Sequence, residues 1–444
     1  MLNEKNFYMI GIGGVSMSAL AKILKAQGKI VCGSDCSLSA WTEELEKCGI
    51  KVFKDGCPKF VKECDVCVYS GAISQNHPDL AFAKKLGKKI MSRAQLLGEI
   101  ASEKKCIAIA GTHGKTTTTG MIATIMLKAG LDPTIHIGGI LNEINSNLHI
   151  GSGEYFLTEA CEYQDAFLSL KSDISVVLNV EADHMDYFKN IENLNNSFKK
   201  FIKNTKNNGF CVINNKTDWA NEDKTNILSF GEGDAFLQAK EIREYNSGRF
   251  CYKLYAGDEY LTEIYLSAYG KHNIENSLAA VAVSLLLDVD LKIIKEGLLQ
   301  YKGVGRRMQT ICKTPHIIHD YAHHPTEIKA AIDTLEKIKK DVIVVFQPHT
   351  FSRTRDLYDE FLKCFSGAKE VWLLPVYPAR EKPIKGVSSK KLAQDLKECG
   401  YRAKYISSFE KCFNQIGLVD NDCIVAILGA GDVEKLVKMF DKND

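Results

Sequence analysis

The sequence has no apolar run that approaches the roughly 18 residues of a membrane-spanning helix, and it has almost no net charge. Its 57 Lys and Arg residues nearly balance its 55 Asp and Glu residues, which leaves a formal net charge of +2. Such a chain has no general electrostatic attraction for nucleic acid or an anionic membrane, so we expect neither as a partner. The N-terminal stretch MLNEKNFYMIGIGG also lacks the basic start and cleavage site of a signal peptide. We therefore expect a cytoplasmic protein.

The sequence also lacks the cysteine spacing of a zinc site, although it contains fifteen cysteines. Many stand in apolar segments, such as Cys106, Cys211 and Cys423. In a reducing compartment such residues act as small buried hydrophobic side chains. The one close pair, Cys64 and Cys67, is followed by no second pair and no matching histidines. A metal or redox role for this pair is therefore the weaker interpretation.

What the sequence does contain is an alternation of predicted strands and helices, which is typical of α/β proteins with mostly parallel sheets. At 444 residues the chain exceeds one hydrophobic core, and about three domains are expected. We predict a Rossmann-like N-terminal domain, a central domain with a P-loop ATPase-type, mostly parallel sheet, and a Rossmann-like C-terminal domain. The predicted boundaries are 1–99, 100–303 and 304–444, with the glycine-rich stretch YKGVGRRMQT as the second linker. Ligands of such sheets bind at the carboxyl ends of the strands.

The segment IAIAGTHGKTTTTGMIATIM, residues 107–126, places two glycines and a lysine between a predicted strand and a predicted helix. Such a turn lets backbone N–H groups point at an anion, and the helix N-terminus adds its positive dipole end. Lys115 can then reach the outer phosphates, and Thr116 can ligate magnesium. The strict P-loop pattern has glycine where Ile109 stands, and the simpler alternative is a solvated helix start capped by threonines. The residues predicted to bind ATP here are Gly111, Thr112, His113, Gly114, Lys115, Thr116 and Thr117.

Two further strand ends carry groups that suit a metal ion. Magnesium prefers oxygen ligands, and Glu159 ends the predicted strand of YFLTEACEYQDAF, while Asp183 and His184 follow the strand ISVVLNV. The alternative is that these groups are helix caps and surface acids. The neighbouring acids Glu162, Asp165 and Asp186 are interpreted as surface groups or as groups that act only through their neighbours.

A second glycine-rich turn, Gly11 to Ser16, follows the first predicted strand, and Asp35 comes about 20 residues later, as in a dinucleotide-binding fingerprint. That pattern would indicate NAD, but Ser16 replaces its third glycine. The same geometry equally holds the diphosphate of a UDP-sugar. Ser70, at another predicted strand end, is expected to face the same ligand.

Nine motifs follow one another along essentially the whole chain: GIGGVSMSALA, GTHGKTTTT, EACEYQDAFL, NVEADHMDYF, YGKHNIENSLAA, GVGRRM, HDYAHHPTEI, FQPHTFSRTRDLYDEF and LGAGD. Together they resemble those of the Mur ligases of peptidoglycan synthesis. The resemblance implies three domains that bind a UDP-sugar, ATP and an incoming amino acid. It also implies ATP-driven amide formation, in which the carboxylate of UDP-N-acetylmuramate becomes an acyl phosphate that the amine of L-alanine attacks. The sequence does not decide between a monomer and a homodimer.

The resemblance assigns roles to individual residues. Lys115, Glu159 and His184 are the expected catalytic residues; Thr116 and Glu159 would hold one Mg²⁺ (or Mn²⁺) and His184 a second. The expected contacts to the rest of ATP are His272, Asn276, Arg307 and Asp320. Helix capping for His272 and a solvated linker for Arg307 are the alternatives.

The remaining expected contacts are to the two substrates that become joined. For the UDP-sugar they are Gly13, Gly14, Val15, Ser16, Asp35 and Ser70. For the amino acid they are Tyr321, His323, Arg353 and Arg355, since a guanidinium bonds both oxygens of a carboxylate. Thr350 stands where many family members have arginine, so one substrate contact of the family is not expected here.

Four other functions remain open at this point. A ligase that joins a whole peptide to the same UDP-sugar would share the N-terminal motifs. Folylpolyglutamate-type ligases share the central motif but not the N-terminal loop. An NAD-dependent oxidoreductase explains that loop but leaves Lys115, Glu159 and His184 without a task. A catalytically silent P-loop module would not need both the lysine and the metal ligands.

Overall fold

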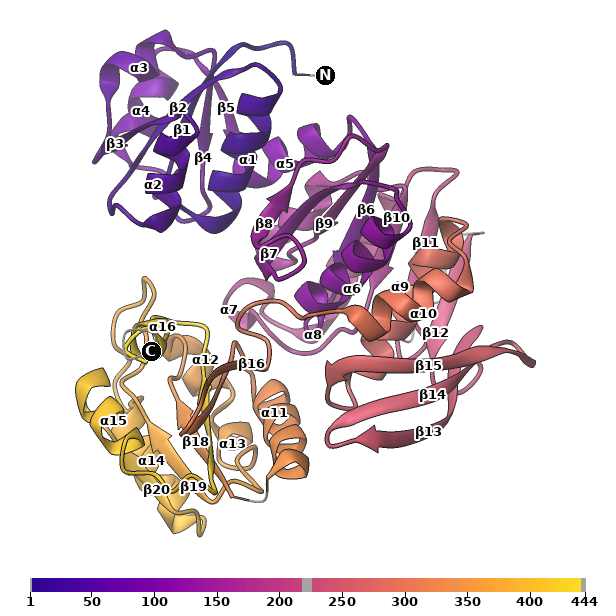
Figure 1. The fold of residues 1–444 in the computed structure, drawn as a ribbon. Coiled ribbons are helices and arrows are strands. Elements are labelled where there is room, and N and C mark those ends of the chain that lie inside the picture. The colour runs from indigo at the N-terminus through magenta and orange to yellow at the C-terminus, as the bar shows by residue number, and fades with distance from the viewer. Residues whose placement is uncertain (1, 218–225, 340, 441–444) are drawn as a thin grey trace. The chain divides into compact units, whose positions relative to one another are not determined.

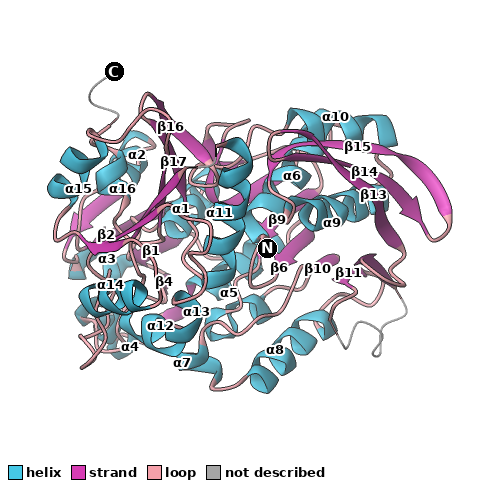
Figure 2. Cartoon of the chain, turned by 90° about the horizontal axis from the view of Figure 1, so that it is seen from below, coloured by secondary structure: helices cyan, strands magenta, loops and turns pink. Residues whose placement is uncertain are grey.

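The computed structural model describes residues 2–217, 226–339 and 341–440, which form an α/β protein with three sheets (Figures 1 and 2). These residues group into two compact units, one made of 1–180, 194–230 and 279–294, the other of 181–193, 231–278 and 295–444. Among the described residues, no helix combines the length and the apolar composition needed to cross a membrane.

The N-terminal sheet has five parallel strands in the order β3-β2-β1-β4-β5, a Rossmann-like arrangement as predicted. Its strands are β1 (Asn6–Ile10), β2 (Ile30–Asp35), β3 (Lys51–Lys54), β4 (Val66–Tyr69) and β5 (Lys89–Ser92). Its helices are α1 (Val15–Ala26), α2 (Ala40–Lys47), α3 (Pro58–Glu63), α4 (Pro78–Lys85) and α5 (Arg93–Ala101). The strand order reverses between β1 and β4, and ligands bind such sheets at the carboxyl ends beside that point. Gly11 and Ser70 follow these two strands.

The central sheet has ten strands in the order β15-β14-β13-β12-β11-β10-β6-β9-β7-β8. The six consecutive strands β12-β11-β10-β6-β9-β7 pair in parallel with one another, whereas β8 and the ribbon β13 to β15 are antiparallel. The strands are β6 (Lys105–Ala110), β7 (Thr134–Leu141), β8 (Ser146–His149), β9 (Tyr155–Glu159), β10 (Ile174–Val177), β11 (Phe210–Asn214), β12 (Ile227–Gly231), β13 (Leu237–Asn246), β14 (Arg249–Ala256) and β15 (Glu259–Tyr269). The helices are α6 (Lys115–Lys128), η1 (Tyr163–Ser169), α7 (Met185–Phe188), α8 (Ile191–Lys203), α9 (Asn273–Leu286) and α10 (Leu291–Gln300).

The C-terminal sheet has the order β16-β17-β21-β18-β19-β20, and only the β16–β17 pair is antiparallel. The strands are β16 (Gln309–Lys313), β17 (His316–Asp320), β18 (Val342–Phe346), β19 (Glu370–Leu373), β20 (Ala403–Tyr405) and β21 (Ile424–Leu428). The helices are α11 (Pro325–Ile338), α12 (Phe351–Asp356), α13 (Tyr358–Phe361), α14 (Ser389–Glu398), α15 (Phe409–Ile416) and α16 (Glu434–Val437).

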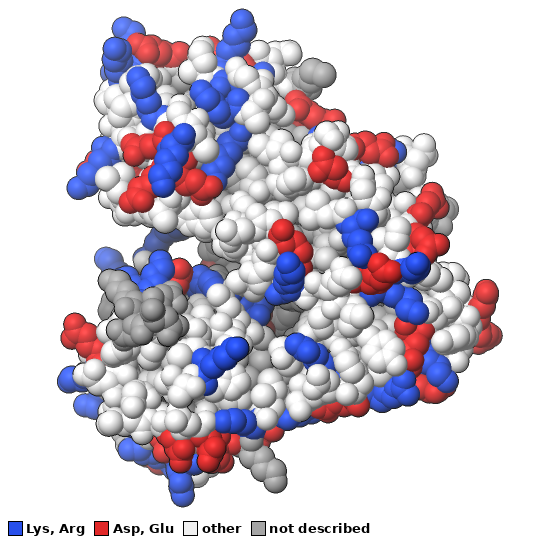
Figure 3. All heavy atoms as spheres, in the orientation of Figure 1, with Lys and Arg blue, Asp and Glu red and all other residues white. Residues whose placement is uncertain are grey.

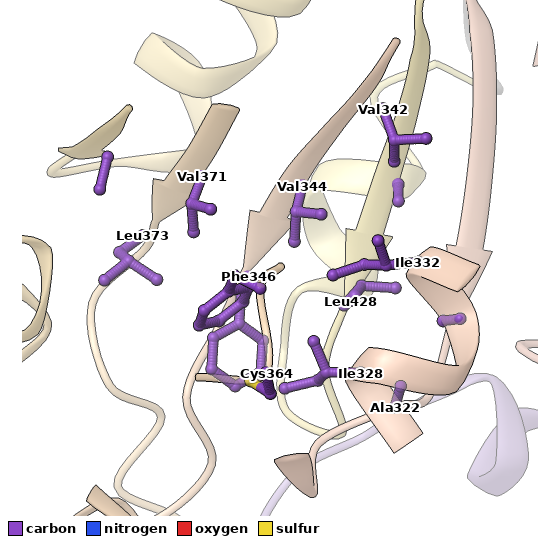
Figure 4. Close-up of a cluster of buried hydrophobic side chains, with 14 of the residues drawn as sticks. Ala322, Ile328, Ile332, Val342, Val344, Phe346, Cys364, Val371, Leu373 and Leu428 are labelled. Atoms are coloured by element: carbon purple, nitrogen blue, oxygen red, sulfur yellow. The ribbon is translucent and has the colours of Figure 1, made fainter. Parts of the chain in front are cut away.

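Continuous apolar strands fix the core of this C-terminal sheet. All five residues of β18, VIVVF, are buried, as expected for a parallel strand that is covered on both faces. Figure 4 shows one side of this core, where Val344 and Phe346 of β18 lie near Ile328 of α11 and Cys364. This packing leaves the polar residues at the strand ends to form the site.

The cysteines named above from apolar segments are buried as predicted, whereas Cys36, Cys48, Cys161 and Cys399 are exposed. All fifteen lie in described residues and are free thiols, and Cys106, Cys211 and Cys423 are buried. The Cys64 thiol is buried as well and donates to the carbonyl oxygen of Val61, 3.2 Å away. On the face drawn in Figure 3, basic and acidic side chains are interspersed rather than gathered by sign.

Candidate active site

The turn between β6 and α6 requires glycine at its first residue. Gly111 has φ 145°, and a Cβ there would lie 2.9 Å from the Cβ of Leu178. Gly114 ends the turn in the left-handed region, with φ 84°, and is the N-cap of α6. As a glycine, this N-cap residue offers no side chain for capping. The first N–H groups of a helix have no acceptor within the helix, and an anion site uses these groups.

Asn179, which the sequence analysis missed, holds this loop from the neighbouring strand end. Its backbone carbonyl accepts from the N–H of Thr112 at 3.1 Å, and its side-chain Oδ1 accepts from the N–H of His113 at 2.8 Å. Its Nδ2 donates to the carbonyl oxygen of His113 at 3.2 Å. Because β10 pairs with β6, an amide side chain just after β10 reaches the loop. The available signal was a polar amide directly after a buried apolar strand.

Lys115, whose side chain is 17% exposed, forms an ion pair with the buried carboxylate of Glu162. Its Nζ lies 3.0 and 3.2 Å from the two carboxylate oxygens of Glu162 and donates to the carbonyl oxygens of Thr112 and Gly111. Burial by itself lowers the pKa of Lys115, but the negative charge of Glu162 outweighs it and the pKa is raised. Glu162 is only 2% exposed, so of its two interpretations the surface group is wrong, whereas its ion pair with Lys115 is that of a group that acts through its neighbour. The carboxylate keeps the ammonium charged at the turn between β6 and α6.

We expect Glu162→Gln to destabilise the protein because it breaks a buried ion pair. Loss of about 3 kcal/mol, or roughly 6 to 12 °C in the unfolding midpoint, is typical for such a change. Glu154→Gln is the matched control, since its pair with Lys105 is more than half exposed and such pairs contribute little. Thermal unfolding of both variants measures the difference. Equal midpoints for the two variants would contradict the inferred role of Glu162.

Glu159 lies at the same sheet edge as the loop. It ends β9, and the strand register sets it opposite Ile109, two residues before Gly111. Its Oε1 accepts from the N–H of Gly138 at 2.6 Å, and a Cβ on Gly138 would lie 3.1 Å from both carboxylate oxygens. Thr116 is the second residue of α6. A hydroxyl and a carboxylate form the oxygen donor set that Mg²⁺ prefers, so these residues fit that ion.

In the second unit, Asp183 and Arg353 form a buried ion pair. Nε and Nη2 of Arg353 donate to the carboxylate of Asp183 at 2.9 to 3.2 Å, and both side chains are one-tenth exposed. Burial raises the pKa of Asp183, but Arg353 and His184 together lower it well below its usual range. His184 has a left-handed backbone with φ 56°, and its Nε2 lies 3.7 Å from Asp183.

A series of neighbouring rings begins at the guanidinium of Arg353. Its Nη1 lies 3.1 Å from Nδ1 of His349, whose ring is 5.9 Å from that of His323. The His323 ring in turn stands edge-on to Tyr321 at 5.3 Å, and burial lowers the pKa of His323 to about 3. The structure therefore groups Tyr321, His323 and Arg353 and adds His349, which was not predicted.

Two neighbouring residues, Arg355 and Thr350, are not part of this group of rings and charges. Arg355 is more than half exposed and its Nε donates to Asp356 at 2.6 Å, so the structure does not bring it to the cluster. Thr350, the residue that departs from the family pattern, is the N-cap of α12, and its Oγ1 accepts from the N–H of Arg353 at 3.3 Å. Thr350 therefore supports the backbone of Arg353.

Asp320 and Arg307 lie at the start of the C-terminal domain. The two oxygens of Asp320 accept from the N–H groups of Met308 and Ala322 at 2.7 and 2.8 Å. Burial raises the pKa of Asp320, although Arg307 opposes this. The guanidinium of Arg307 lies 5.3 Å from the ring of Tyr321, so it is not a simple solvated linker residue.

His272 and Asn276 do not share one environment. His272 is exposed and precedes α9, which begins at Asn273. Asn276 is 6% exposed, and its Nδ2 donates to Oδ1 of Asn273 at 2.8 Å. Asn273 itself donates to the carbonyl oxygen of Tyr269 at 2.6 Å, which ties the helix start to the end of β15.

The N-terminal loop is held by its own acid. Oδ2 of Asp35 accepts from the N–H of Gly13 at 2.9 Å, so this carboxylate orders the turn. Ser70 donates its N–H to the carbonyl oxygen of Ile10, beside the loop as expected. Of the other predicted residues, Gly14 and Val15 are exposed and Ser16 is half-buried.

Comparisons with known proteins cover nearly the whole chain. Residues 6–105 match the family model "Mur ligase family, catalytic domain", 109–284 the "Mur ligase middle domain" and 306–431 the "Mur ligase, glutamate ligase domain". The UDP-N-acetylmuramate–L-alanine ligase of Caldicellulosiruptor saccharolyticus is 43% identical over 98% of both chains. The structure of the UDP-N-acetylmuramate–alanine ligase of Thermotoga maritima superposes with a TM-score of 0.85, 25% identity and 99% coverage of both chains. A murein peptide ligase of Psychrobacter arcticus has a TM-score of 0.73 at 21% identity, with 99% and 98% of the two chains covered, and so shares the fold.

Proposed function

The chain belongs to the Mur ligase family, and from this premise we infer that it is the ATP-dependent ligase that joins L-alanine to UDP-N-acetylmuramate in peptidoglycan synthesis. The observation that carries the inference is 43% identity, over 98% of both chains, to a ligase of that name. The geometry at the edge of the central sheet agrees with it, because Lys115 and Glu159 flank a phosphate-binding turn. The three-domain fold is that of the family, and the boundaries 1–99, 100–303 and 304–444 stay a prediction.

The reaction must bring two anions together. An oxygen of the lactyl carboxylate attacks the γ-phosphorus of ATP, ADP leaves, and an acyl phosphate forms. The amine of L-alanine then attacks the acyl carbon, loses a proton and expels phosphate. Phosphoryl transfer of this kind depends on positioning and on positive charge around the transferring group.

Residues of the central sheet would supply that charge. The N–H groups of the Gly111–Thr117 turn and the N-terminus of α6 face the phosphates in this proposal, and Lys115 adds a full positive charge. When bound, Mg²⁺ would neutralise the phosphate oxygens. Thr116 and Glu159 would hold one ion. His184 would hold a second by family resemblance, although imidazole is an unusual ligand for so hard a cation.

The second unit would contribute residues that bind the nucleotide and L-alanine. His272, Asn276, Arg307 and Asp320 are proposed for the nucleotide. Tyr321, His323 and Arg353 are proposed for L-alanine, and Arg355 is the weakest candidate because it is exposed. The loop Gly13 to Ser16, with Asp35 and Ser70, is proposed for the UDP-sugar. We also propose a cytoplasmic enzyme that acts as a monomer or homodimer.

The function is tested with a panel of amine substrates. We expect phosphate release from ATP only when UDP-N-acetylmuramate and an amino acid are both present. L-Alanine should give the highest kcat/KM, with glycine and L-serine below it and the tripeptide L-Ala-γ-D-Glu-meso-diaminopimelate inactive. A coupled phosphate assay measures all four amines on the same enzyme preparation. Turnover with the tripeptide but not with L-alanine would assign the chain to the recycling ligases instead.

A further inference from the structure

Three hydrogen bonds in a row connect the N-terminal loop with the central sheet. Arg93 donates through Nη1 to Oγ of Ser16 at 3.2 Å, and Ser16 Oγ lies 2.9 Å from Nε2 of His136. Nδ1 of His136 lies 2.9 Å from Oγ1 of Thr158. His136 is 5% exposed and Thr158 is fully buried. All four residues belong to the same compact unit.

Thr158, the last residue of this series of hydrogen bonds, determines which atom donates and which accepts in each of them. The hydroxyl of Thr158 donates to the carbonyl oxygen of Glu159 at 3.0 Å, so its oxygen accepts from Nδ1–H of His136. Burial lowers the pKa of His136 to about 3, which keeps the ring neutral and makes Nε2 an acceptor. Ser16 then donates to Nε2 and accepts from Arg93. Each hydrogen bond in this series therefore has one donor and one acceptor, and all of them point in the same direction, from the N-terminal loop to the backbone carbonyl of Glu159.

Strand β7, which contains His136, also makes a hydrogen bond to the carboxylate of Glu159. Gly138, two residues further along β7, donates its N–H to Oε1 of Glu159 at 2.6 Å. The register of β7 and β9 pairs His136 with Thr158. The segment from His136 to Gly138 therefore contacts two consecutive residues of β9, of which the second is the proposed metal ligand. A second contact fixes the loop itself, since Nδ2 of Asn147 on β8 donates to the carbonyl oxygen of Val15 at 2.9 Å.

We propose that His136 is a positioning residue that couples the UDP-sugar loop to the metal carboxylate Glu159. The inference rests on the proposed function, because it takes Ser16 as part of the sugar site. A bound diphosphate attracts Arg93 and the loop, and the hydrogen bonds transmit the resulting position of Ser16 through the imidazole to Thr158 and Glu159. Occupancy of the sugar site thereby strengthens metal binding at the ATP site, and by linkage the reverse holds by the same factor.

The test measures how each ligand changes the affinity for the other. Calorimetry gives the Mg²⁺ concentration for half-maximal binding of adenylyl imidodiphosphate, with and without saturating UDP-N-acetylmuramate. In the wild-type enzyme we expect the sugar to lower this concentration by about fivefold or more, the lower end of ordinary coupling energies. In His136→Phe the factor should fall to about one, while each ligand alone still binds.

Two further variants separate coupling from folding. Thr158→Val removes a single hydroxyl and should also abolish the factor, so it replaces His136→Phe if that variant fails to fold. His149→Phe is the matched control, because His149 lies on the adjacent strand β8 and pairs with Asp132 instead; it should retain the full factor. A factor near one in the wild type, or an unchanged factor in both His136→Phe and Thr158→Val, overturns the proposal. Failure of the wild type to bind UDP-N-acetylmuramate would refute the proposed function instead.

Discussion

Replacement of Lys115 by alanine is expected to lower kcat by a factor on the order of 10³, the upper range for loss of one positively charged or hydrogen-bonding group at a transition state. The side chain is the full positive charge that lies within the phosphate turn, where its Nζ donates to the carbonyl oxygens of Gly111 and Thr112. The Kd of UDP-N-acetylmuramate, measured without nucleotide or Mg²⁺, should change by less than about twofold, because the coupling proposed above needs the metal ion at Glu159 and not the ammonium of Lys115. Steady-state kinetics and calorimetry on one preparation give both values.

Lys128→Ala is the matched control for this prediction. Lys128 ends the same helix, α6, and is exposed, so its removal should leave kcat nearly unchanged. Lys115→Arg should recover little activity, since a guanidinium is larger than the ammonium that fits between the loop and Glu162. If Lys115→Ala abolished UDP-sugar binding in the absence of nucleotide, Lys115 would belong to the sugar site, which contradicts its assignment to the phosphates. A normal kcat would remove Lys115 from the mechanism.

The sequence predicted the parts of this site that are local in the chain. The order of apolar strand, glycine turn and helix from 105 to 128 is confirmed, because a buried run that meets Gly111 and Gly114 allows few other conformations. The carboxyl-edge rule for parallel sheets correctly brought Glu159 to the same edge. The Rossmann-like N-terminal order and the C-terminal sheet followed from the same alternation of elements.

Side-chain partners that are distant in sequence were beyond such rules. Glu162 directly precedes the irregular η1 segment, in which Gln164 and Asp165 have positive φ. Because this segment has no periodic pattern of apolar residues, the sequence does not predict that the side chain of Glu162 is buried. Asn179 and His136 lie next to predicted features, but their contacts depend on which strands become neighbours. The antiparallel ribbon β13 to β15 was also not predicted strand by strand. Each of these depends on tertiary packing, which local propensity does not encode.

Arg353 offers the clearest case of a long-range partner, and its replacement by lysine should mainly raise the KM for L-alanine. Asp183 lies 170 residues away in sequence, and its carboxylate accepts hydrogen bonds from Nε and Nη2 on one edge of the guanidinium. Nη1 lies 3.1 Å from Nδ1 of His349, whose ring neighbours that of His323. A planar fork can bond Asp183 and a second carboxylate at once, whereas an ammonium lacks that geometry. We expect the KM for L-alanine to rise about 100-fold, which equals about 2.7 kcal/mol.

The partial reaction shows whether this loss concerns the amino acid or the phosphoryl transfer. Hydroxylamine traps an acyl phosphate as a hydroxamate without L-alanine, so the trapping rate reports the first step alone. Arg353→Lys should leave that rate within about threefold of the wild type, because the interaction it loses is made with the amine substrate. Arg402→Lys, at an exposed position next to β20, is the control and should change neither quantity. If Arg353→Lys instead slowed trapping and left the KM for L-alanine unchanged, Arg353 would act on the phosphoryl group, and the carboxylate of alanine would need another partner.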